Sequence, residues 1–389
     1  SESGIEASGI GITCANINRG QIGGRRNIII NGAAMVAQRG DTTSGVTGDG
    51  YATDRFKAVM NSSGTLTISQ DSDAPGGTGF RKCHRLTQTT AQGSLDANDL
   101  TTFRYSAEGY DLQGFKKGGS GAEEFTVSFW VKSVDQSSYP VTYILELRDP
   151  VNTRSCCKAY TVSASNTWEY KTITFPADTS GQWAASNAKA LEMNWFVCAG
   201  SNYTSGTLST TWATTVTANR AAGLTANLSA NTANRFFLTG VQLEVGSVAT
   251  PFEHRSYGDE MLRCKRYFQP FIQYAEYVSG GTGNLGFPYT AFTVPMRASP
   301  TFVSDHESKS SNWSFASMQV QGSDAYGYYA YAISYNTTNS NESSFRVIAA
   351  RAIAGAVFFP SDSRIIFPNL KVYIKTQKKI IKKKDNKNL

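Results

Sequence analysis

The side chains in this sequence best suited to ligand binding are large aromatic residues outside obviously apolar surroundings. Trp130 falls on the polar face of an alternating segment whose other face is already apolar. Trp183, Tyr203 and Trp212 lie in or near segments rich in Gly, Ser, Thr and Asn. A flat apolar ring with a polar tip suits a wet recognition site, where it can stack on a sugar. We therefore take these four residues as candidate ligand-binding residues.

The same rings have a structural alternative, which the sequence leaves open. Trp130 either stacks on a ligand or packs beneath a loop or another subunit. Trp183 and Trp212 suit recognition and core packing about equally. Trp195 sits on the apolar face of its alternating segment, so we expect it in the core. The Tyr-rich run 326–335 suits subunit packing or distal receptor contact better than a cofactor site.

Catalysis finds little support in the pattern of residues. The three histidines lack metal-ligand spacing, and no Gly-x-Ser-x-Gly nucleophile elbow occurs. Residues 281–286 match Gly-x-Gly-x-x-Gly, but Phe287 and Pro288 follow where a dinucleotide site needs a helix. Four carboxylates are candidates for a glycosidase pair, although sequence cannot give their separation: Glu123, Glu124, Glu192 and Glu244. We expect no enzymatic activity and no cofactor.

Two loops offer the oxygen ligands that calcium prefers. One is Asp71-Ser-Asp73, and the other runs from Asp49 to Asp54. Neither follows the spacing of an EF-hand loop, and Asp is also a common turn former. We therefore expect turns at both places and predict no metal site.

The elements that carry these residues are predicted to be strands with one apolar and one polar face. Phe125, Val127, Phe129 and Val131 share one face, with Trp130 on the other. Segments 141–147 and 191–197 repeat this alternation, and turn-forming residues separate the segments. Two antiparallel sheets packed face to face need this pattern. The sequence therefore predicts an all-β protein built on an antiparallel jelly-roll β-sandwich.

The most informative stretch is residues 235–253, which contain Gln242-Leu243-Glu244. Val241 and Leu243 point to one side of the predicted strand, and Gln242 and Glu244 point to the other. Gly240 stands where the apolar parity shifts, so we expect a bulge there. Glu244 lies on the polar face, where a salt bridge or a turn contact is its ordinary role.

This stretch resembles the last strand of a β-sandwich module found in bacteriophage tail-fibre and other virion structural proteins. The resemblance covers roughly residues 22–270 and rests on several motifs together. Tyr51-Ala-Thr-Asp-Arg-Phe56 departs from the family's pattern, which often has Trp after the Arg. The other matching motifs are Asn27–Gly32, Gln38-Arg39-Gly40, Phe125–Lys132, Ser256–Glu260 and Cys264–Phe268.

The resemblance implies a virion protein, most simply a homotrimeric tail-fibre component that attaches to a host-surface glycan or receptor by many weak contacts. Such modules are similar to carbohydrate-binding jelly rolls, which implies sugar binding. The alternative is a capsid decoration or tail-assembly adaptor with a purely structural role. The long repetitive solenoid expected of a polysaccharide-degrading tailspike does not occur in the sequence.

The domain organisation follows from changes in composition along the chain. Ser256 is predicted to cap a helix over residues 256–268, with Asp259 at the third position. Alternation at Tyr329, Tyr331 and Tyr335 predicts a second β-domain. We expect an extended N-terminal arm (1–45) that binds other virion proteins, a jelly-roll β-sandwich (46–255), a helical linker (256–269), a smaller C-terminal β-domain (270–376) and a Lys-rich tail (377–389).

Composition argues against several other classes of protein. No apolar run reaches the roughly 18 residues of a membrane span, and no basic-then-apolar leader indicates secretion. Residues 371–389 hold eight Lys and one Asp, which account for the whole net charge of +7. The rest of the chain is about neutral, so we predict neither nucleic-acid binding nor membrane insertion. The six cysteines form no CxxC pair and are predicted to be free thiols.

Overall fold

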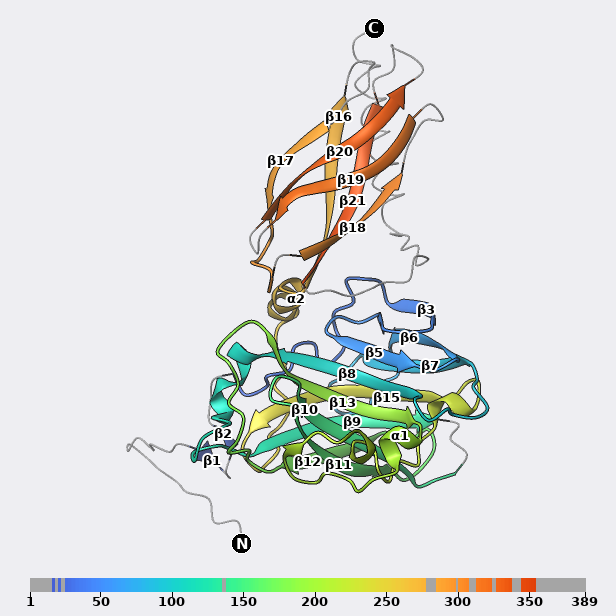
Figure 1. Ribbon diagram of the computed structural model, residues 1–389, viewed down its shortest axis with the longest axis vertical. Helices are drawn as coiled ribbons and strands as arrows, with labels where there is room; N and C mark the ends of the chain where they lie inside the picture. Colours follow the sequence, from blue (N-terminus) through green and yellow to red (C-terminus); the bar gives the residue numbers. More distant parts are fainter. Residues whose placement is uncertain are drawn as a thin grey trace.

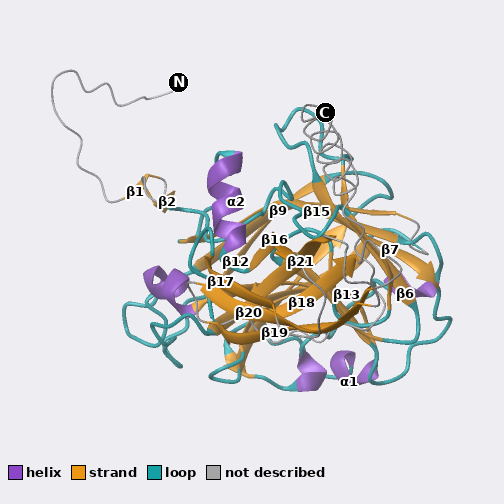
Figure 2. Ribbon diagram, turned by 90° about the horizontal axis from the view of Figure 1, so that it is seen from above, coloured by secondary structure: helices purple, strands orange, loops and turns teal. Residues whose placement is uncertain are grey.

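The protein is described by a computed structural model, in which most of the chain is β-structure (Figure 1). The backbone is described for residues 16–17, 20–21, 25–134, 138–277, 285–298, 300–307, 313–323, 327–337 and 344–354. Side chains are described for residues 25–134, 138–270 and 291–298. Seen from above, the described helices lie at the margin of the molecule and strands fill its interior (Figure 2).

Two antiparallel sheets form the sandwich. The six-stranded sheet has the order β12 (Glu169–Phe175), β9 (Phe125–Val134), β15 (Arg235–Val245), β7 (Cys83–Thr90), β6 (Thr65–Asp71) and β3 (Thr42–Val46). The seven-stranded sheet has the order β14 (Ala213–Thr214), β11 (Arg154–Val162), β10 (Val141–Asp149), β13 (Lys189–Ala199), β8 (Leu100–Glu108), β5 (Phe56–Asn61) and β4 (Gly50–Tyr51).

The order of the central strands makes the sandwich a jelly roll. From β7 to β13, the chain places β7, β9 and β12 in one sheet and β8, β10, β11 and β13 in the other, and β15 inserts between β7 and β9. This is the arrangement of eight strands in two interleaved Greek keys. The predicted fold class is therefore confirmed.

The alternation of apolar and polar residues along the strands predicted the core correctly. Phe125, Val127, Phe129 and Val131 of β9 are fully buried, and so is Trp195 of β13. The ring of Trp195 meets that of Phe129 edge-on, with centroids 5.8 Å apart. These side chains therefore form part of one hydrophobic cluster between the two sheets.

The polar faces of the strands are less wet than the alternation predicts. Glu192 and Asn194 of β13 are buried on the outer face of the seven-stranded sheet, together with Glu146 of β10. The Glu192 carboxylate is covered by Arg104 (3.1 Å) and Arg148 (3.0 Å). Connecting segments and long cationic side chains thus cover a face that a strand-by-strand pattern assigns to solvent.

Connections between strands include short helical turns at the edge of the sandwich. They are the 3-10 helices η1 (Gly109–Phe115), η2 (Thr217–Asn219) and η3 (Leu228–Ala230), and the α-helix α1 (Ser201–Thr204). Near the N-terminus, β1 (Asn16–Ile17) and β2 (Gly20–Gln21) form a two-stranded ribbon.

The expected arm of residues 1–45 differs from the structure over its described second half. Ile29 and Ile30 are buried, and the Ile28 amide donates to the Leu243 carbonyl (3.0 Å). The Val241 amide in turn donates to the Gly32 carbonyl (3.0 Å). Residues 27–32 pack on the sandwich because the backbone of β15 at Val241 and Leu243 supplies hydrogen-bond partners for them. Residues 1–15 lie outside the described residues, so attachment through them stays a prediction.

Helix α2 (Tyr257–Lys265) follows the sandwich and begins as predicted. Ser256 caps it, and its hydroxyl accepts a hydrogen bond from the Asp259 amide (3.2 Å). The helix ends three residues earlier than the predicted residue 268, because Phe268 already begins β16. In Figure 1 this helix lies between the sandwich and the strands of the C-terminal domain.

The C-terminal domain consists of two three-stranded antiparallel sheets. One has the order β16 (Phe268–Tyr277), β21 (Ser344–Ala354) and β18 (Pro300–Glu307), and the other has the order β17 (Leu285–Ala291), β20 (Gly327–Thr337) and β19 (Trp313–Ser323). The predicted Lys-rich tail 377–389 lies outside the described residues. None of the helices in the described part of the chain combines the length and apolarity that a membrane span needs.

The junction between the sandwich and α2 gathers several of the motifs that carry the family resemblance. Arg39 forms an ion pair with Asp54 (3.0 Å), and its guanidinium lies 3.9 Å from the centroid of the Phe268 ring. Arg55 lies over the Tyr267 ring at 3.4 Å. These motifs, distant in sequence, thus fix the start of the C-terminal domain against the sandwich.

Candidate functional site

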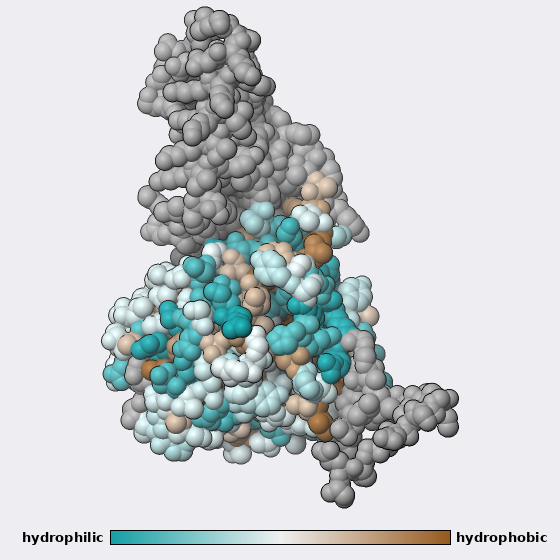
Figure 3. Space-filling model, turned by 180° about the vertical axis from the view of Figure 1, so that it is seen from behind, coloured by the Kyte–Doolittle hydropathy of each residue, from teal (hydrophilic) through white to brown (hydrophobic). Residues whose placement is uncertain are grey.

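An open groove of about 740 Å³ lies on the outer face of the six-stranded sheet, over β12, β9 and β15. It is lined by Thr78, Phe80, Ser128, Trp130, Tyr170, Thr172, Gly240, the segment 247–252 and His254. On the face of the sandwich seen in Figure 3, hydrophobic residues occur as isolated spots among hydrophilic ones.

The floor of the groove is an aromatic pair. Tyr170 of β12 lies directly opposite Trp130 of β9 in the strand register. Their ring centroids are 5.4 Å apart and their planes are tilted by 46°. Tyr170 is 46% exposed, and Trp130 is partly exposed. Because side chains alternate along a strand, Ser128 and Thr172 share this face and place hydroxyls beside the rings.

One wall of the groove is the segment after β15, which Gln242 and Glu244 hold in place. Glu244 accepts hydrogen bonds from the Thr250 amide (2.9 Å) and hydroxyl (2.7 Å). The Gln242 amide group donates to the Thr250 carbonyl (3.1 Å) and accepts from the Glu253 amide (2.9 Å). Both side chains are fully buried. The turn contact expected of Glu244 is confirmed, and it positions residues 247–252 beside the aromatic pair.

Next to this wall lies Phe80, whose position depends on Gly240. The φ of Gly240, +61°, lies in the left-handed region, and a Cβ there would come within 2.6 Å of the Phe80 ring. The strand register shifts between Thr239 and Gln242, as the predicted bulge requires. Phe80 packs edge-on against Phe252, with centroids 5.0 Å apart, and His254 lies beside both rings. Only glycine allows Phe80 this close approach to the sheet.

The chemistry of the groove is that of an uncharged surface. Among the described residues that line it, none is Asp, Glu, Lys or Arg. Exposed aromatic faces offer apolar contact area, and Thr172, which is also exposed, has a hydroxyl that can donate or accept hydrogen bonds, while Ser128 is only 3% exposed. A neutral polyhydroxyl ligand matches both properties. Across the described residues, no group of three or more His, Cys, Asp or Glu side chains is arranged to hold a metal ion.

Trp183 and Trp212, predicted as candidates for ligand binding, lie elsewhere. They are 4% and 9% exposed and belong to the hydrophobic core. The Trp183 ring meets the Phe125 ring edge-on, with centroids 5.6 Å apart. Trp212 donates its indole N–H to the Pro176 carbonyl (2.9 Å). Their loop-rich sequence surroundings fold over the end of the sandwich, so both rings pack inward and have little surface left for a ligand.

Tyr203 is also separated from the groove. It is partly buried and packs against a small apolar cluster that includes Ile144, Cys157 and Phe196. That cluster lies on the strands of the seven-stranded sheet, while Trp130 belongs to the other sheet. Of the four residues taken as candidates, only Trp130 lies in the groove.

The sequence analysis did not identify several of the residues that line the groove. Tyr170 and Thr172 alternate with Lys171 and Ile173, a signal that was present but weak in a short, polar strand. Phe80 and His254 come from segments far apart in sequence, and only the fold brings them together. No local pattern predicts their meeting.

Two of the carboxylates considered for catalysis, Glu192 and Glu244, do not share a site. Glu244 is in the six-stranded sheet and Glu192 in the seven-stranded sheet. Burial by itself would raise the pKa of Glu192, but Arg104, Lys189 and Arg148 outweigh it and lower this pKa to about 2. Glu123 pairs with Lys116 (2.7 Å) at the surface.

The aspartates considered as calcium ligands are used in ion pairs. Asp49 pairs with Lys57 (2.6 Å), and Asp54 pairs with Arg39 (3.0 Å). The other two ion pairs are Asp71 with Arg85 and Asp73 with Lys132. The described cysteines are free and buried: Cys83, Cys156, Cys157, Cys198 and Cys264.

No family model and no curated protein match this sequence. Among solved structures, the chain is similar to the enzymatically active domain of tailspike protein 4 of bacteriophage CBA120, at 11% identity and a TM-score of 0.30. That alignment covers 56% of this chain and 21% of the tailspike chain. The chain is also similar to the family 11 carbohydrate-binding module of a Clostridium thermocellum cellulosomal cellulase, at 9% identity and a TM-score of 0.27, covering 54% and 97% of the two chains.

A third similar structure is the CBM22-1 xylan-binding domain from Paenibacillus barcinonensis Xyn10C. The identity is 11% and the TM-score 0.25, with 55% of this chain and all (100%) of that chain covered. The neighbours thus include a phage tailspike domain and carbohydrate-binding modules. Identities and TM-scores this low carry no conclusion about ligand or activity.

Proposed function

We propose that this protein is a non-catalytic glycan-binding component of a bacteriophage virion, and that the groove over Trp130 and Tyr170 is its binding site. The observation that carries the proposal is the exposed aromatic pair in an uncharged, hydroxyl-lined groove. Sugar rings present apolar C–H faces to an aromatic ring and hydroxyls to polar neighbours. Both kinds of contact are available on the same strand face.

The rigidity of the groove supports binding. Residues 247–252 are tied to β15 by Gln242 and Glu244, and Phe80, which packs on Phe252, lies against Gly240. A site that is formed before the ligand arrives loses less conformational entropy on binding. We therefore propose that the groove recognises its ligand without a large rearrangement.

We propose attachment to a host surface as the role of this binding, in a tail fibre that is a homotrimer. The family resemblance of residues 22–270 supports this assignment. A single shallow groove gives weak binding, whereas several copies on one fibre raise the apparent affinity without new contacts. We propose that this binding involves no cleavage of the glycan; the described lining of the groove contains neither Asp nor Glu.

A second candidate function is a capsid decoration or tail-assembly adaptor. The junction around Arg39, Asp54 and Tyr267 favours it, because these contacts fix the C-terminal domain as a rigid spacer would require. In that case the aromatic pair would be covered by another virion protein.

A glycan array probed with the full chain distinguishes the two functions. The test variant is Trp130→Ala and the control variant is Tyr110→Ala, since Tyr110 is a 60% exposed aromatic outside the groove. Binding that falls for Trp130→Ala and persists for Tyr110→Ala supports the glycan-binding function. Absence of binding by the folded wild-type chain would favour the structural role, and release of shortened glycans would contradict the non-catalytic proposal.

A further inference from the structure

The exposed aromatic surface continues past the groove along β12, an edge strand of its sheet. Trp168 immediately precedes β12, two residues before Tyr170, and is partly exposed. Because side chains alternate along an extended chain, Trp168 and Tyr170 project from the same face, about 7 Å apart along the strand. A ligand that lies on Tyr170 therefore meets Trp168 when it extends along this edge by one further position on that face.

Contacts with β9 and β15 confirm that Trp168 lies on this outer face. Lys132 follows Trp130 by two residues on the same side of β9, and its ammonium group lies 5.4 Å from the centroid of the Trp168 ring. Phe237 of β15 is opposite Lys132 in the strand register, and its ring centroid lies 6.1 Å from that of Trp168. Lys132 and Phe237 are almost completely buried. Of these three side chains, Trp168 thus has the surface that a ligand can reach.

Asp73 adds a hydrogen-bonding group beside Trp168. Its carboxylate accepts a hydrogen bond from the Trp168 indole N–H (3.2 Å) and forms an ion pair with Lys132. The Asp73 side chain is nevertheless 48% exposed. A carboxylate has about four lone-pair sites, of which these two contacts use two. The remaining lone pairs can accept hydrogen bonds from the hydroxyls of a ligand.

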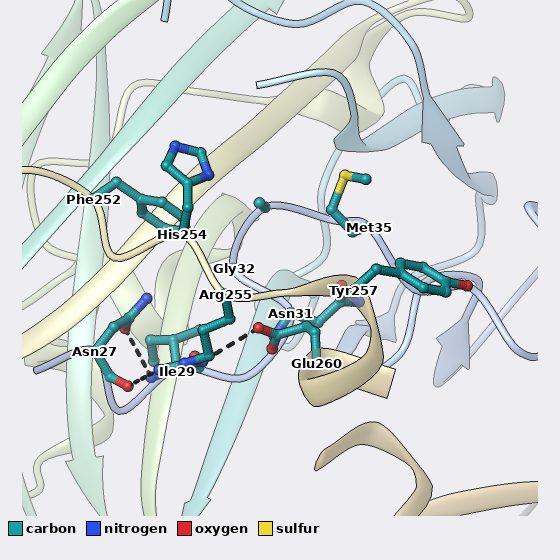
Figure 4. Close-up of a pocket in the computed structure, with 11 residues that line it drawn as sticks. Asn27, Ile29, Asn31, Gly32, Met35, Phe252, His254, Arg255, Tyr257 and Glu260 are labelled. Carbon is teal, nitrogen blue, oxygen red and sulfur yellow. Dashed lines mark hydrogen bonds and ion pairs between the residues drawn. The ribbon is translucent and has the colours of Figure 1, made fainter. Parts of the chain in front are cut away.

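The groove also borders a small cavity of about 70 Å³ beside α2, and Phe252 and His254 line both (Figure 4). The charged groups around that cavity are already paired. Arg255 lies 3.4 Å from Glu260, which also accepts a hydrogen bond from the Asn31 amide. A ligand gains little from groups that are satisfied in this way. Continuation of the binding surface along β12 is therefore favoured over continuation into the cavity.

We propose that Trp168 and Asp73 form a second sugar subsite, so that the ligand is an oligosaccharide of at least two units that lies along β12. One unit stacks on Trp130 and Tyr170, and the next stacks on Trp168 and donates its hydroxyls to Asp73. This inference rests on the proposed glycan-binding function. The second stacking contact should make a two-unit ligand bind about fivefold to tenfold more tightly than a single unit.

The test is calorimetric titration with one, two and three linked units of the sugar that binds best on a glycan array. Wild-type affinity should rise from one unit to two. Trp168→Ala should remove most of this rise and retain the affinity for the single unit, whereas Tyr170→Ala should weaken the binding of both ligands. Tyr110→Ala is the matched control, because Tyr110 is 60% exposed and lies outside the groove, and it should behave as the wild type.

Hydroxyl-radical footprinting of the wild-type protein provides a second measurement that needs no variant. The two-unit ligand should protect Trp168 together with Tyr170 from oxidation. The single unit should protect Tyr170 and leave the oxidation of Trp168 unchanged. This difference reports contact at Trp168 directly, whether or not Trp168→Ala folds.

The outcomes separate this inference from the proposed function. Equal wild-type affinity for one and two units, or a rise that survives in folded Trp168→Ala, overturns the second subsite alone. Unchanged oxidation of Trp168 while the two-unit ligand protects Tyr170 also overturns it alone. Absence of binding to every member of the array by the folded chain overturns both the subsite and the proposed function.

Discussion

Tyr170 lies directly opposite Trp130 across the β12–β9 pairing, with ring centroids 5.4 Å apart on the outer face of the sandwich. The inner face of β9 is already filled by Phe125, Val127 and Phe129, so the pair contributes nothing to the main core. Cross-strand aromatic pairs stabilise a sheet modestly, by about 0.2–1 kcal/mol. Their exposure in a shaped groove is therefore better explained by binding than by stability.

Replacing the Trp130 ring on the floor of the groove is expected to weaken glycan binding and leave folding almost intact. Trp130→Ala should weaken glycan binding by about 2 kcal/mol, or roughly 30-fold, because a central aromatic anchor is lost. Titration calorimetry measures the affinity, and chemical denaturation measures stability. Tyr110→Ala, a change at an exposed aromatic elsewhere, should leave the affinity unchanged. Equal loss in both variants would contradict the assignment of the site.

Trp183 is expected to act through stability and not through binding. Trp183→Ala removes a buried ring packed edge-on against Phe125, so the free energy of unfolding should fall by about 3–5 kcal/mol. Trp183→Phe keeps an aromatic ring and should lose less. Urea denaturation monitors both variants. A Trp183→Ala protein of unchanged stability that no longer binds glycan would show that this residue belongs to a binding site.

The sequence predicted the scaffold better than the site. Alternation at Phe125–Val131 and around Trp195 places the core correctly, because burial of one strand face is a local property of the chain. Trp183 and Trp212 were harder to assign, since a loop-rich neighbourhood does not say whether that loop folds outward or over the core. The groove depends on contacts such as Phe80 with Gly240, which join residues 160 positions apart and leave no local signal.

Glu244 is expected to control the order of the groove wall. Glu244→Ala leaves the Thr250 amide and hydroxyl without their acceptor, which should cost about 1–3 kcal/mol and loosen residues 247–252. Hydrogen exchange in that segment should become faster, and glycan binding should weaken. Glu244→Gln retains one acceptor oxygen and should have a smaller effect. Unchanged hydrogen exchange at residues 247–252 in Glu244→Ala would contradict the proposal that the contacts of Glu244 with Thr250 hold this segment in place.

Acid is expected to destabilise the fold, beginning with His84. Burial lowers the pKa of His84 from 6.5 to about 3, so the folded state resists protonation. The unfolded chain therefore binds this proton first, and stability is lost as the pH falls from 6.5 toward 3. At pH 4 the loss from this group is roughly 3 kcal/mol. Glu192, with its pKa of about 2, adds a second loss between pH 4.5 and pH 2.

Denaturant titrations at several pH values separate the two groups. His84→Phe keeps a ring against Phe56, whose centroid is 4.1 Å from that of His84, and should flatten the stability profile between pH 6.5 and 4.5. Glu192→Gln should flatten it below pH 4.5. A His84→Phe profile parallel to that of the wild type above pH 4.5 would rule out His84 as the cause.

Lys117 is expected to stabilise the end of the sandwich that holds Trp183. Its ammonium group is completely buried and lies 2.8 Å from Asp149 and 3.2 Å from Asp178. Lys117→Met leaves these buried carboxylates without that partner, so the free energy of unfolding should fall by about 3–5 kcal/mol. Lys116→Met, at the exposed neighbouring position, is the control and should have little effect. Similar stability of the two variants, measured by urea denaturation, would refute this role.

The most direct test of the glycan-binding groove is hydroxyl-radical footprinting of the full chain with and without a bound saccharide. Oxidation of Trp130 and Tyr170, read by mass spectrometry, should fall severalfold when the saccharide is present, while oxidation of the exposed Tyr110 should stay constant. Protection of these two residues would locate the ligand on the aromatic pair. Unchanged oxidation of both residues, under conditions where the saccharide is bound, would place the binding site elsewhere and contradict the proposed function of the groove.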